Sequence, residues 1–224
     1  MRIALATFFM KTFLIVLFVV LQLSQGTAFA QEKDKEGFTL VRQDRNISVF
    51  EKWMTWPGST PPDPSRELKC EFYYKNTIYA GLHLIKDDKQ VMNWQTHVSE
   101  YKIYLQQDTT AWFEYSYHDI PWPVSDQDHY MEYKVVAKSP TLLLITFKSR
   151  VNNNVAPQRK GVTRLQLTGS WTLEQVSPEK VKATYRVLSK PIDIPKIFID
   201  PIIRGNMVTT MAEFSNIIEA KEKL

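Results

Sequence analysis

Alternating apolar and polar residues run through most of the chain and predict a succession of β-strands. Side chains along a strand point to opposite faces in turn, so a period of two indicates a half-buried strand. On this pattern the expected strands span residues 46–53, 67–74, 101–107, 110–118, 127–137, 141–151, 162–174 and 181–188. Residues 54–66 hold four prolines and a glycine and are expected to form a loop, and residues 152–160 a hairpin loop.

Two stretches between the early strands have helical spacing instead. Residues 77–84 are harder to assign, with a helix slightly favoured. Residues 87–98 are expected to form a short helix that begins at Asp87 or Asp88 as the N-cap. The order of elements is then two strands, short helices, six antiparallel strands and a C-terminal helix, which indicates an α+β domain.

The tail of the chain predicts one long amphipathic helix. Asp200 is the expected N-cap, and Pro201 suits the first helical position, where its missing N–H has no consequence. A broad apolar face is formed by residues at helical spacing, namely Ile203, Met207, Met211, Phe214 and Ile218.

The first thirty residues have the features of a secretory signal peptide. Arg2 and Lys11 are basic, residues 12–23 are mostly apolar, and residues 28–30 (AFA) form a small-residue cleavage signal. Residues 1–30 are therefore expected to be a cleaved signal peptide, 31–36 a flexible charged leader, and 37–224 one domain that is exported to the periplasm or secreted. An uncleaved anchor is the alternative, although a bilayer span needs about 20 apolar residues.

Charge and cysteine content narrow the function further. Removal of the first thirty residues takes away two bases and no acid, so the formal net charge falls from +4 to +2. A nearly balanced chain without a basic stripe argues against nucleic-acid binding. Cys70 is the only cysteine, so no internal disulfide is available and core packing must hold the fold.

The residue types used in metal sites and nucleophilic catalysis form no recognisable motif. The chain has no Cys-x-x-Cys, no Gly-x-Ser-x-Gly and no glycine-rich phosphate loop, and its histidines do not pair at ligand spacing. His118 and His129 flank a proline-rich corner and can meet in space, most simply as hydrogen-bonded histidines. Neither a metal nor a cofactor is expected.

That corner carries a family resemblance. Residues 121–128, PWPVSDQD, resemble the corner between two strands in START domains, the steroidogenic-acute-regulatory-related lipid-transfer family. Gln127 departs from the arginine that the family usually has there. Residues 169–173, GSWTL, resemble the family's Gly-x-Trp strand, and residues 191–195, PIDIP, followed by a helix with Asn206, resemble its entry into the last helix.

The resemblance covers residue 37 to the C-terminus and implies a helix-grip fold, in which a curved antiparallel sheet wraps around a long C-terminal helix. It also implies a non-enzymatic carrier or transfer protein that binds a lipid or other apolar small molecule in a groove between sheet and helix. The expected partners are that ligand and, transiently, a membrane; the protein is expected to be a monomer.

Strand alternation selects the residues expected to line such a groove. Residues 112–118 and 162–172 each have one mixed polar face and one apolar face. The candidates are Trp112, Glu114, Ser116, His118, Arg164 and Gln166, with Ile203, Met207, Met211 and Phe214 from the tail helix. Glu114 and Arg164 are candidates to pair with each other, because a buried charge must be paired or neutralised. The alternative is that the polar faces simply meet water.

Two other functions remain open. Polyketide cyclases and aromatases share the helix-grip architecture by family resemblance, and Glu114, His118 and Arg164 are then the acid–base candidates. Export argues against such an enzyme, because those substrates are made on cytoplasmic synthases. The third reading is an interaction module whose cavity is filled by its own side chains.

Overall fold

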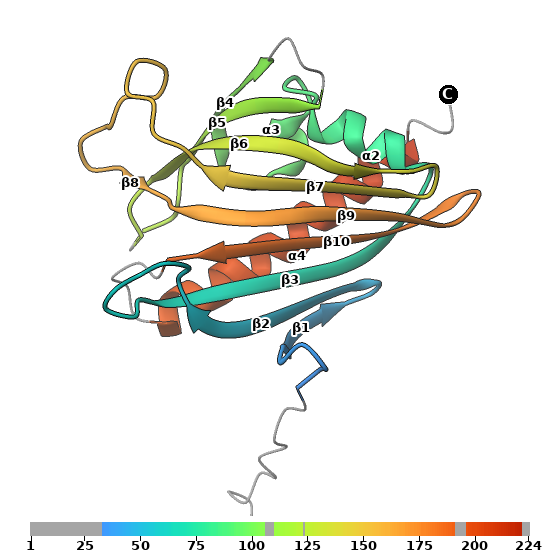
Figure 1. The fold of residues 1–224 in the computed structure, drawn as a ribbon, viewed down its shortest axis with the longest axis horizontal. Coiled ribbons are helices and arrows are strands. Elements are labelled where there is room, and N and C mark those ends of the chain that lie inside the picture. Colours follow the sequence, from blue (N-terminus) through green and yellow to red (C-terminus); the bar gives the residue numbers. More distant parts are fainter. Residues whose placement is uncertain (1–32, 106–109, 123, 191–195, 221–224) are drawn as a thin grey trace, which may run out of the picture. The chain divides into compact units, whose positions relative to one another are not determined.

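A ten-stranded, mostly antiparallel sheet forms the bulk of the described chain (Figure 1). The structure is a computed structural model, and it describes residues 33–105, 110–122, 124–190 and 196–220. Within these ranges the strand order is β1-β2-β3-β10-β9-β7-β6-β5-β4, and β8 pairs with β6 outside this order. The strands are β1 (Thr39–Asp44), β2 (Ile47–Thr55), β3 (Pro64–Lys75), β4 (Val98–Leu105), β5 (Ala111–His118), β6 (Gln127–Lys138), β7 (Leu142–Ser149), β8 (Thr163–Arg164), β9 (Leu167–Ser177) and β10 (Lys180–Ser189).

The helices of the described residues pack on one face of this sheet. They are α2 (Ile78–Ile85), α3 (Val91–Trp94) and α4 (Lys196–Ala220), and α4 runs across the sheet and contacts β1, β2, β3 and both shorter helices (Figure 1). The expected α+β helix-grip arrangement is thus confirmed. No helix in the described ranges is both long and apolar enough to cross a membrane. The expected signal peptide and the motif at residues 191–195 lie outside the described residues.

The long helix begins earlier than the sequence predicted. It starts at Lys196, so Pro201 lies inside the helix rather than at its first position. Asp200 lies inside the helix and is therefore not its N-cap. Its carboxylate accepts hydrogen bonds from Arg66 at 2.5 Å and from Arg204 at 3.2 Å. The missing N–H of the proline removes the helical partner of the Ile197 carbonyl, at a residue that is 78% exposed and close to water.

Of the two helices expected before β4, one forms near its predicted bounds and the other is much shorter than predicted. α2 confirms a helix near residues 77–84, and Thr77 caps it by accepting a hydrogen bond from the Ala80 N–H. The helix expected at residues 87–98 shrinks to the four residues of α3, and its N-cap is Gln90 rather than Asp87 or Asp88. Val98 already belongs to β4, which limits the space for helix.

Three strand assignments differ from the sequence pattern. β1 was not predicted, because this edge strand is half or fully exposed and lacks a clear apolar face. β3 begins at Pro64, so the expected loop over residues 54–66 is shorter than predicted. The single strand expected at residues 162–174 divides into β8, which pairs in parallel with Gln127 and Asp128, and β9.

The expected leader lies partly against the sheet. Asp34 accepts a hydrogen bond from Lys69 Nζ at 2.6 Å and another from the backbone N–H of Phe38 at 2.9 Å. Phe38 is fully buried, with the ammonium groups of Lys52 and Lys69 within 4.6 Å of its ring centroid. The compact unit that contains the sheet begins at Lys33.

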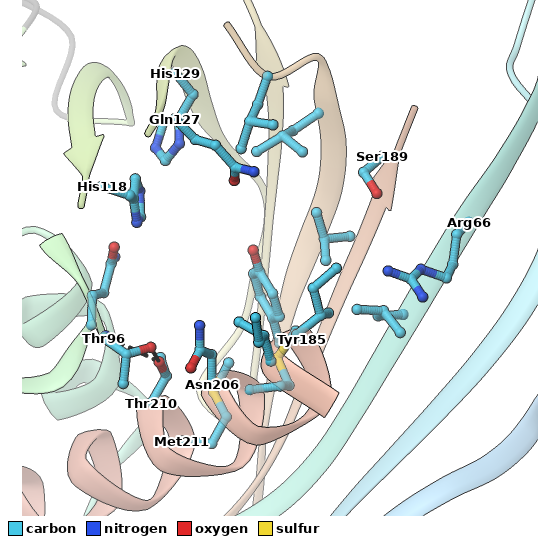
Figure 2. A pocket seen from close by; sticks show the side chains of 18 of the residues that line it. Arg66, Thr96, His118, Gln127, His129, Tyr185, Ser189, Asn206, Thr210 and Met211 are labelled. Atoms are coloured by element: carbon cyan, nitrogen blue, oxygen red, sulfur yellow. Dashed lines mark hydrogen bonds between the residues drawn. The ribbon is translucent and has the colours of Figure 1, made fainter. Parts of the chain in front are cut away.

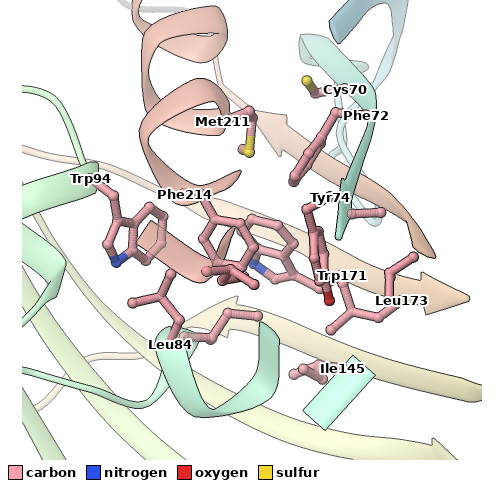
Figure 3. Close-up of a cluster of buried hydrophobic side chains, with 14 of the residues drawn as sticks. Cys70, Phe72, Tyr74, Leu84, Trp94, Ile145, Trp171, Leu173, Met211 and Phe214 are labelled. Carbon is pink, nitrogen blue, oxygen red and sulfur yellow. The ribbon is translucent and has the colours of Figure 1, made fainter. Parts of the chain in front are cut away.

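Aromatic rings fill the space between α4 and the sheet at the end where α2 and α3 pack (Figure 3). Phe214 of α4 lies between 5.1 and 5.9 Å from the ring centroids of Phe72, Tyr74, Trp94 and Trp171. The Gly-x-Trp motif has a steric reason, because a Cβ at position 169 would lie 2.0 Å from the Arg186 carbonyl oxygen. Cys70 is buried in the same core without a disulfide partner, and burial raises the pKa of its thiol to about 12.

Candidate functional site

A cavity of about 340 Å³ lies between the sheet and the N-terminal half of α4, within the usual range of small-molecule sites. Its apolar wall combines β3, β9, β10 and α4, through residues such as Leu68, Leu167, Val187, Ile199, Ile203 and Met207. These side chains are aliphatic, and aromatic rings such as Trp94, Trp171 and Tyr185 also line the cavity. The cavity is therefore suited to an apolar ligand.

Polar side chains without formal charge line another part of the cavity. His118 and Gln127 come from β5 and β6, Thr96 precedes β4, and Asn206 and Thr210 belong to α4 (Figure 2). The Thr96 and Thr210 hydroxyls are 3.0 Å apart and hydrogen-bonded. In Figure 2 the amide of Asn206 and the hydroxyl of Tyr185 both point into the open space. The cavity thus pairs one aliphatic wall with one hydrogen-bonding wall.

A buried carboxylate organises the hydrogen-bonding wall. Glu114 is 2% exposed and accepts hydrogen bonds from Tyr101 Oη at 2.6 Å, Tyr133 Oη at 3.2 Å and His129 Nε2 at 3.0 Å. Three donors on one carboxylate replace the hydration that burial removes. Burial, followed by the negative charge of Glu114, raises the pKa of both Tyr101 and Tyr133 well above the ordinary value, so both phenols stay protonated donors.

His118 and His129 do meet beside this carboxylate, as the sequence suggested. Their ring centroids are 5.3 Å apart, and His118 Nε2 lies 3.0 Å from the Ser116 hydroxyl. Burial, and next the neighbouring His129 ring, lower the pKa of His118 to about 3, against the opposing effect of a hydrogen bond to the Thr96 backbone. His118 is therefore a neutral imidazole at physiological pH.

An ion-pair cluster, Glu51, Arg66, Asp200 and Arg204, borders the cavity near the start of α4 through Arg66. Arg66 lines the cavity and pairs with Asp200 at 2.5 Å and Glu51 at 3.5 Å. Arg204, one turn after Asp200, pairs with the same two acids at 3.2 and 3.1 Å. The cluster joins β2 and β3 to α4 and is called the latch below.

Five of the ten residues selected from the sequence line the cavity. They are Glu114, His118, Ile203, Met207 and Met211. Trp112 is instead fully buried behind the cavity and stacks on Tyr133 at 5.0 Å, and Phe214 belongs to the aromatic core. Ser116 is buried as the partner of His118. These three residues support the wall without forming it.

Arg164 and Gln166 correct the sequence prediction, because they lie on the wrong face. Leu165 and Leu167, on the alternate face, line the cavity, whereas Gln166 is exposed. Arg164 does not pair with Glu114; it binds both carboxylate oxygens of Asp128, at 2.5 and 2.8 Å. Asp128 is fully buried, so this pair anchors β8 and the preceding loop to β6 on the outer side of the sheet.

Sequence reasoning missed several lining residues, chiefly His129, Tyr133, Tyr185 and Gln127. His129 was visible only as a neighbour of the proline-rich corner. Register supplies the reason, since Gln127 pairs with His118, His129 with Ser116 and Tyr133 with Trp112, which sets these residues on the face of Glu114. Strand pairing was the signal needed, and a single sequence does not contain it.

The described residues hold no cluster of three or more His, Cys, Asp or Glu side chains arranged for a metal ion. Ser125, the only serine beside an acid and a histidine in the corner, bonds to the Thr163 hydroxyl at 3.0 Å. Asp126 accepts a hydrogen bond from Tyr117 Oη instead. These hydrogen bonds stabilise the corner, and neither of them joins a nucleophile to a general base.

Comparisons with known proteins agree on the fold. No family model matches the sequence, and no curated protein matches it significantly. The STAR-related lipid transfer protein from Xanthomonas axonopodis is similar in structure, with 21% identity, a TM-score of 0.66 and coverage of 81% of this chain and 98% of that chain. Human StAR-related lipid transfer protein 5 is similar with 14% identity, a TM-score of 0.68 and coverage of 95% and 97%.

A third similar structure is the Zhui aromatase/cyclase from Streptomyces sp. R1128, with 9% identity, a TM-score of 0.52 and coverage of 69% of this chain and 94% of that chain. At such identities the likeness establishes the fold alone. Residues 33–220, where described, form a START-like domain with the helix-grip fold, so the resemblance predicted from the sequence is confirmed at that level.

Proposed function

We propose that this protein is a non-enzymatic carrier that holds a lipid or other apolar small molecule between the sheet and α4. The observation that carries the proposal is the cavity itself, which is lined by aliphatic side chains of β3, β9, β10 and α4. Each CH₂ group transferred from water into such a space contributes about 0.8 kcal/mol. The similar lipid transfer structures support the proposal through the shared fold.

The test begins with protein purified without detergent. We expect native mass spectrometry to detect a bound apolar molecule that organic extraction removes, and we expect the extracted protein to take up lipid from vesicles. A chain that carries nothing after purification and takes up nothing from vesicles contradicts the carrier.

Exposed apolar side chains near the cavity support transient contact with a membrane surface. Trp122 is 92% exposed and follows Ile120, which lines the cavity, by two residues. Ile197 precedes the lining residue Ile199 by two residues and is also exposed. Trp side chains favour the membrane interface, so Trp122→Ala should slow lipid uptake from vesicles. Met92→Ala, at an exposed residue of α3, is the control and should not.

Export is part of the proposal and rests on the signal-peptide features of residues 1–30. The intact mass of protein recovered from the periplasm or medium should correspond to a chain that begins at Gln31. Recovery of the full-length chain in the membrane fraction contradicts it.

One observation favours a second candidate, a cyclase-like enzyme. Glu114, His129 and Tyr133 form a buried hydrogen-bonded group that touches the cavity, the kind of group that general acid–base catalysis uses. A polyketide-like compound converted to a new product, with conversion lost in Glu114→Gln, supports the enzyme. Binding without conversion supports the carrier.

A further inference from the structure

The described lining residues of the cavity are most buried at one end. The wall at that end, called the end wall below, consists of four residues from four elements, namely Ile85 at the end of α2, Trp94 of α3, Trp171 of β9 and Met211 of α4. Each of them is only 1–4% exposed. In contrast, the lining residue Trp53, whose ring lies beside Arg66 of the latch, is 41% exposed. A ligand that enters from the exposed end therefore has its inner end against the end wall.

Packed aromatic rings lie directly behind the end wall. Phe214 follows Met211 by three residues on the same side of α4 and is fully buried. Its ring centroid is 5.1 Å from that of Trp94 and 5.3 Å from that of Trp171. Figure 3 shows Met211 beside these rings. The cavity cannot extend past Met211 unless the aromatic core rearranges, because a packed core has no room for further atoms.

We propose that the Met211 side chain sets the greatest length of apolar chain that the cavity accepts. The inference rests on the proposed carrier function and names the residue that selects among its ligands. Along α4 the lining residues run from Ile199 to Met211, and at 1.5 Å per residue this segment spans about 18 Å. An extended chain advances about 1.2 Å per bond, so about 15 carbons reach from one end of this segment to the other.

A limit of this kind is visible when the protein competes with a bilayer for chains of different length. A CH₂ group gains a similar free energy in an apolar cavity and in a bilayer, because both remove it from water. Transfer from vesicle to protein should therefore not depend on length as long as the chain fits. Each carbon beyond the limit has to stay in water, which weakens binding roughly fourfold.

The experiment offers the protein a mixture of linear 1-alkanols with 8 to 20 carbons in phosphatidylcholine vesicles. After incubation the vesicles are removed by centrifugation, and mass spectrometry measures the ratio of protein-bound to vesicle-bound alcohol for each length. For wild-type protein we expect a constant ratio for the shorter chains and a fall of at least threefold per added carbon beyond the limit.

Methionine variants assign the limit to one residue. Met211→Ala removes three heavy atoms from the end wall, so the limit should move by at least two carbons toward longer chains. Met211→Leu, a change of a kind that cores tolerate well, shortens the side chain by one atom and should move the limit by about one carbon, which keeps the test available if Met211→Ala does not fold. Met207→Ala makes the same change one helical turn away, in the side of the cavity, and should leave the limit unchanged.

Two results overturn the inference. One is a wild-type ratio that stays constant from 8 to 20 carbons, and the other is a limit that is the same in wild type and in the folded variants at position 211. In both cases the protein still takes up alcohol, so the carrier function stands. If wild-type protein takes up none of the alcohols and no vesicle lipid, the proposed function fails together with the inference.

Discussion

The two halves of α4 face the same sheet but meet it in different ways. The C-terminal half presents Phe214, which is fully buried and whose ring contacts aromatic residues of β3, β9 and α3 (Figure 3). The N-terminal half presents Ile203 and Met207, which line a cavity of about 340 Å³ together with aliphatic side chains of the sheet and rings such as Trp171 and Tyr185. Met211 lies at the boundary and belongs to both the core and the cavity wall.

The side chains of α4 differ in size between the two halves, since Phe214 carries a ring and Ile203 and Met207 do not, and only the hollow half also borders a polar wall. Aromatic rings bury large areas and fill the gap between helix and sheet. Branched aliphatic chains and methionine are shorter or more adaptable and do not fill it. We conclude that the filled half supplies stability and that the hollow half is available for a ligand at little cost to the fold.

Removal of the Phe214 ring should give the largest difference in stability between changes in the two halves of α4. Phe214→Ala should lower the free energy of unfolding by about 3–5 kcal/mol, because it opens a cavity inside a packed cluster. Ile203→Ala in the hollow half should lose less than half as much, since its side chain already borders open space. Urea unfolding of both variants measures the contrast, and equal losses would show that the two halves are packed alike.

The pH dependence of stability should report on His118, which lies in the polar wall of the cavity. Unfolded His118 takes up a proton as pH falls below about 6.5. The folded ring resists protonation until its pKa of about 3. The unfolded state therefore binds more protons between these values, and stability falls with falling pH by at most about 1.4 kcal/mol per pH unit from this group.

Unfolding at a series of pH values from 7 to 4 tests this expectation. His118→Gln should flatten the slope, whereas His83→Gln, at an exposed residue of α2, should leave it unchanged. An identical slope in wild type and His118→Gln would mean that His118 is not held neutral by the cavity wall.

A larger side chain in the cavity should weaken ligand binding while it leaves the stability of the fold nearly unchanged. Met207→Trp places a ring where ligand is expected, so affinity for a neutral amphiphile should fall at least tenfold while the free energy of unfolding changes by less than about 1 kcal/mol. Overpacking of a filled core would instead cost about 1–3 kcal/mol. Met92→Trp, on the exposed side of α3, controls for the added tryptophan. If Met207→Trp is destabilised and the wild-type protein binds no amphiphile, then Met207 lies in a packed core and not in a ligand cavity.

The smallest expected effect concerns the latch at the start of α4. Asp200→Asn removes one of the two acids that Arg66 and Arg204 share, while Glu51 still pairs with both. Stability should fall by only about 1 kcal/mol, but ligand exchange, followed by stopped-flow fluorescence, should become faster. Glu100→Gln breaks an exposed pair with Arg159 and should not affect exchange. Equal exchange rates in all three proteins would exclude the latch as a barrier to ligand entry.

The alternation of apolar and polar residues predicted the fold more accurately than it predicted which residues line the cavity. Alternation correctly separated the two faces of β5, and the inward face does carry Glu114 and His118. The same rule separated the faces of residues 162–172 just as well, but the polar face with Arg164 was assigned to the cavity although it faces outward. Periodicity identifies two faces of a strand and does not say which one meets the helix.

The amino-acid sequence by itself determined the run of strands, the long apolar face of the last helix and the absence of an internal disulfide. These features depend on the periodicity, size and chemistry of neighbouring residues. Only the tertiary structure decided that Asp128 pairs with Arg164 and that Glu114 is hydrogen-bonded to His129. It also decided that Phe214 packs against aromatic rings whereas Met207 borders a cavity. Such choices depend on strand register and on the distance between helix and sheet, which the whole chain sets together.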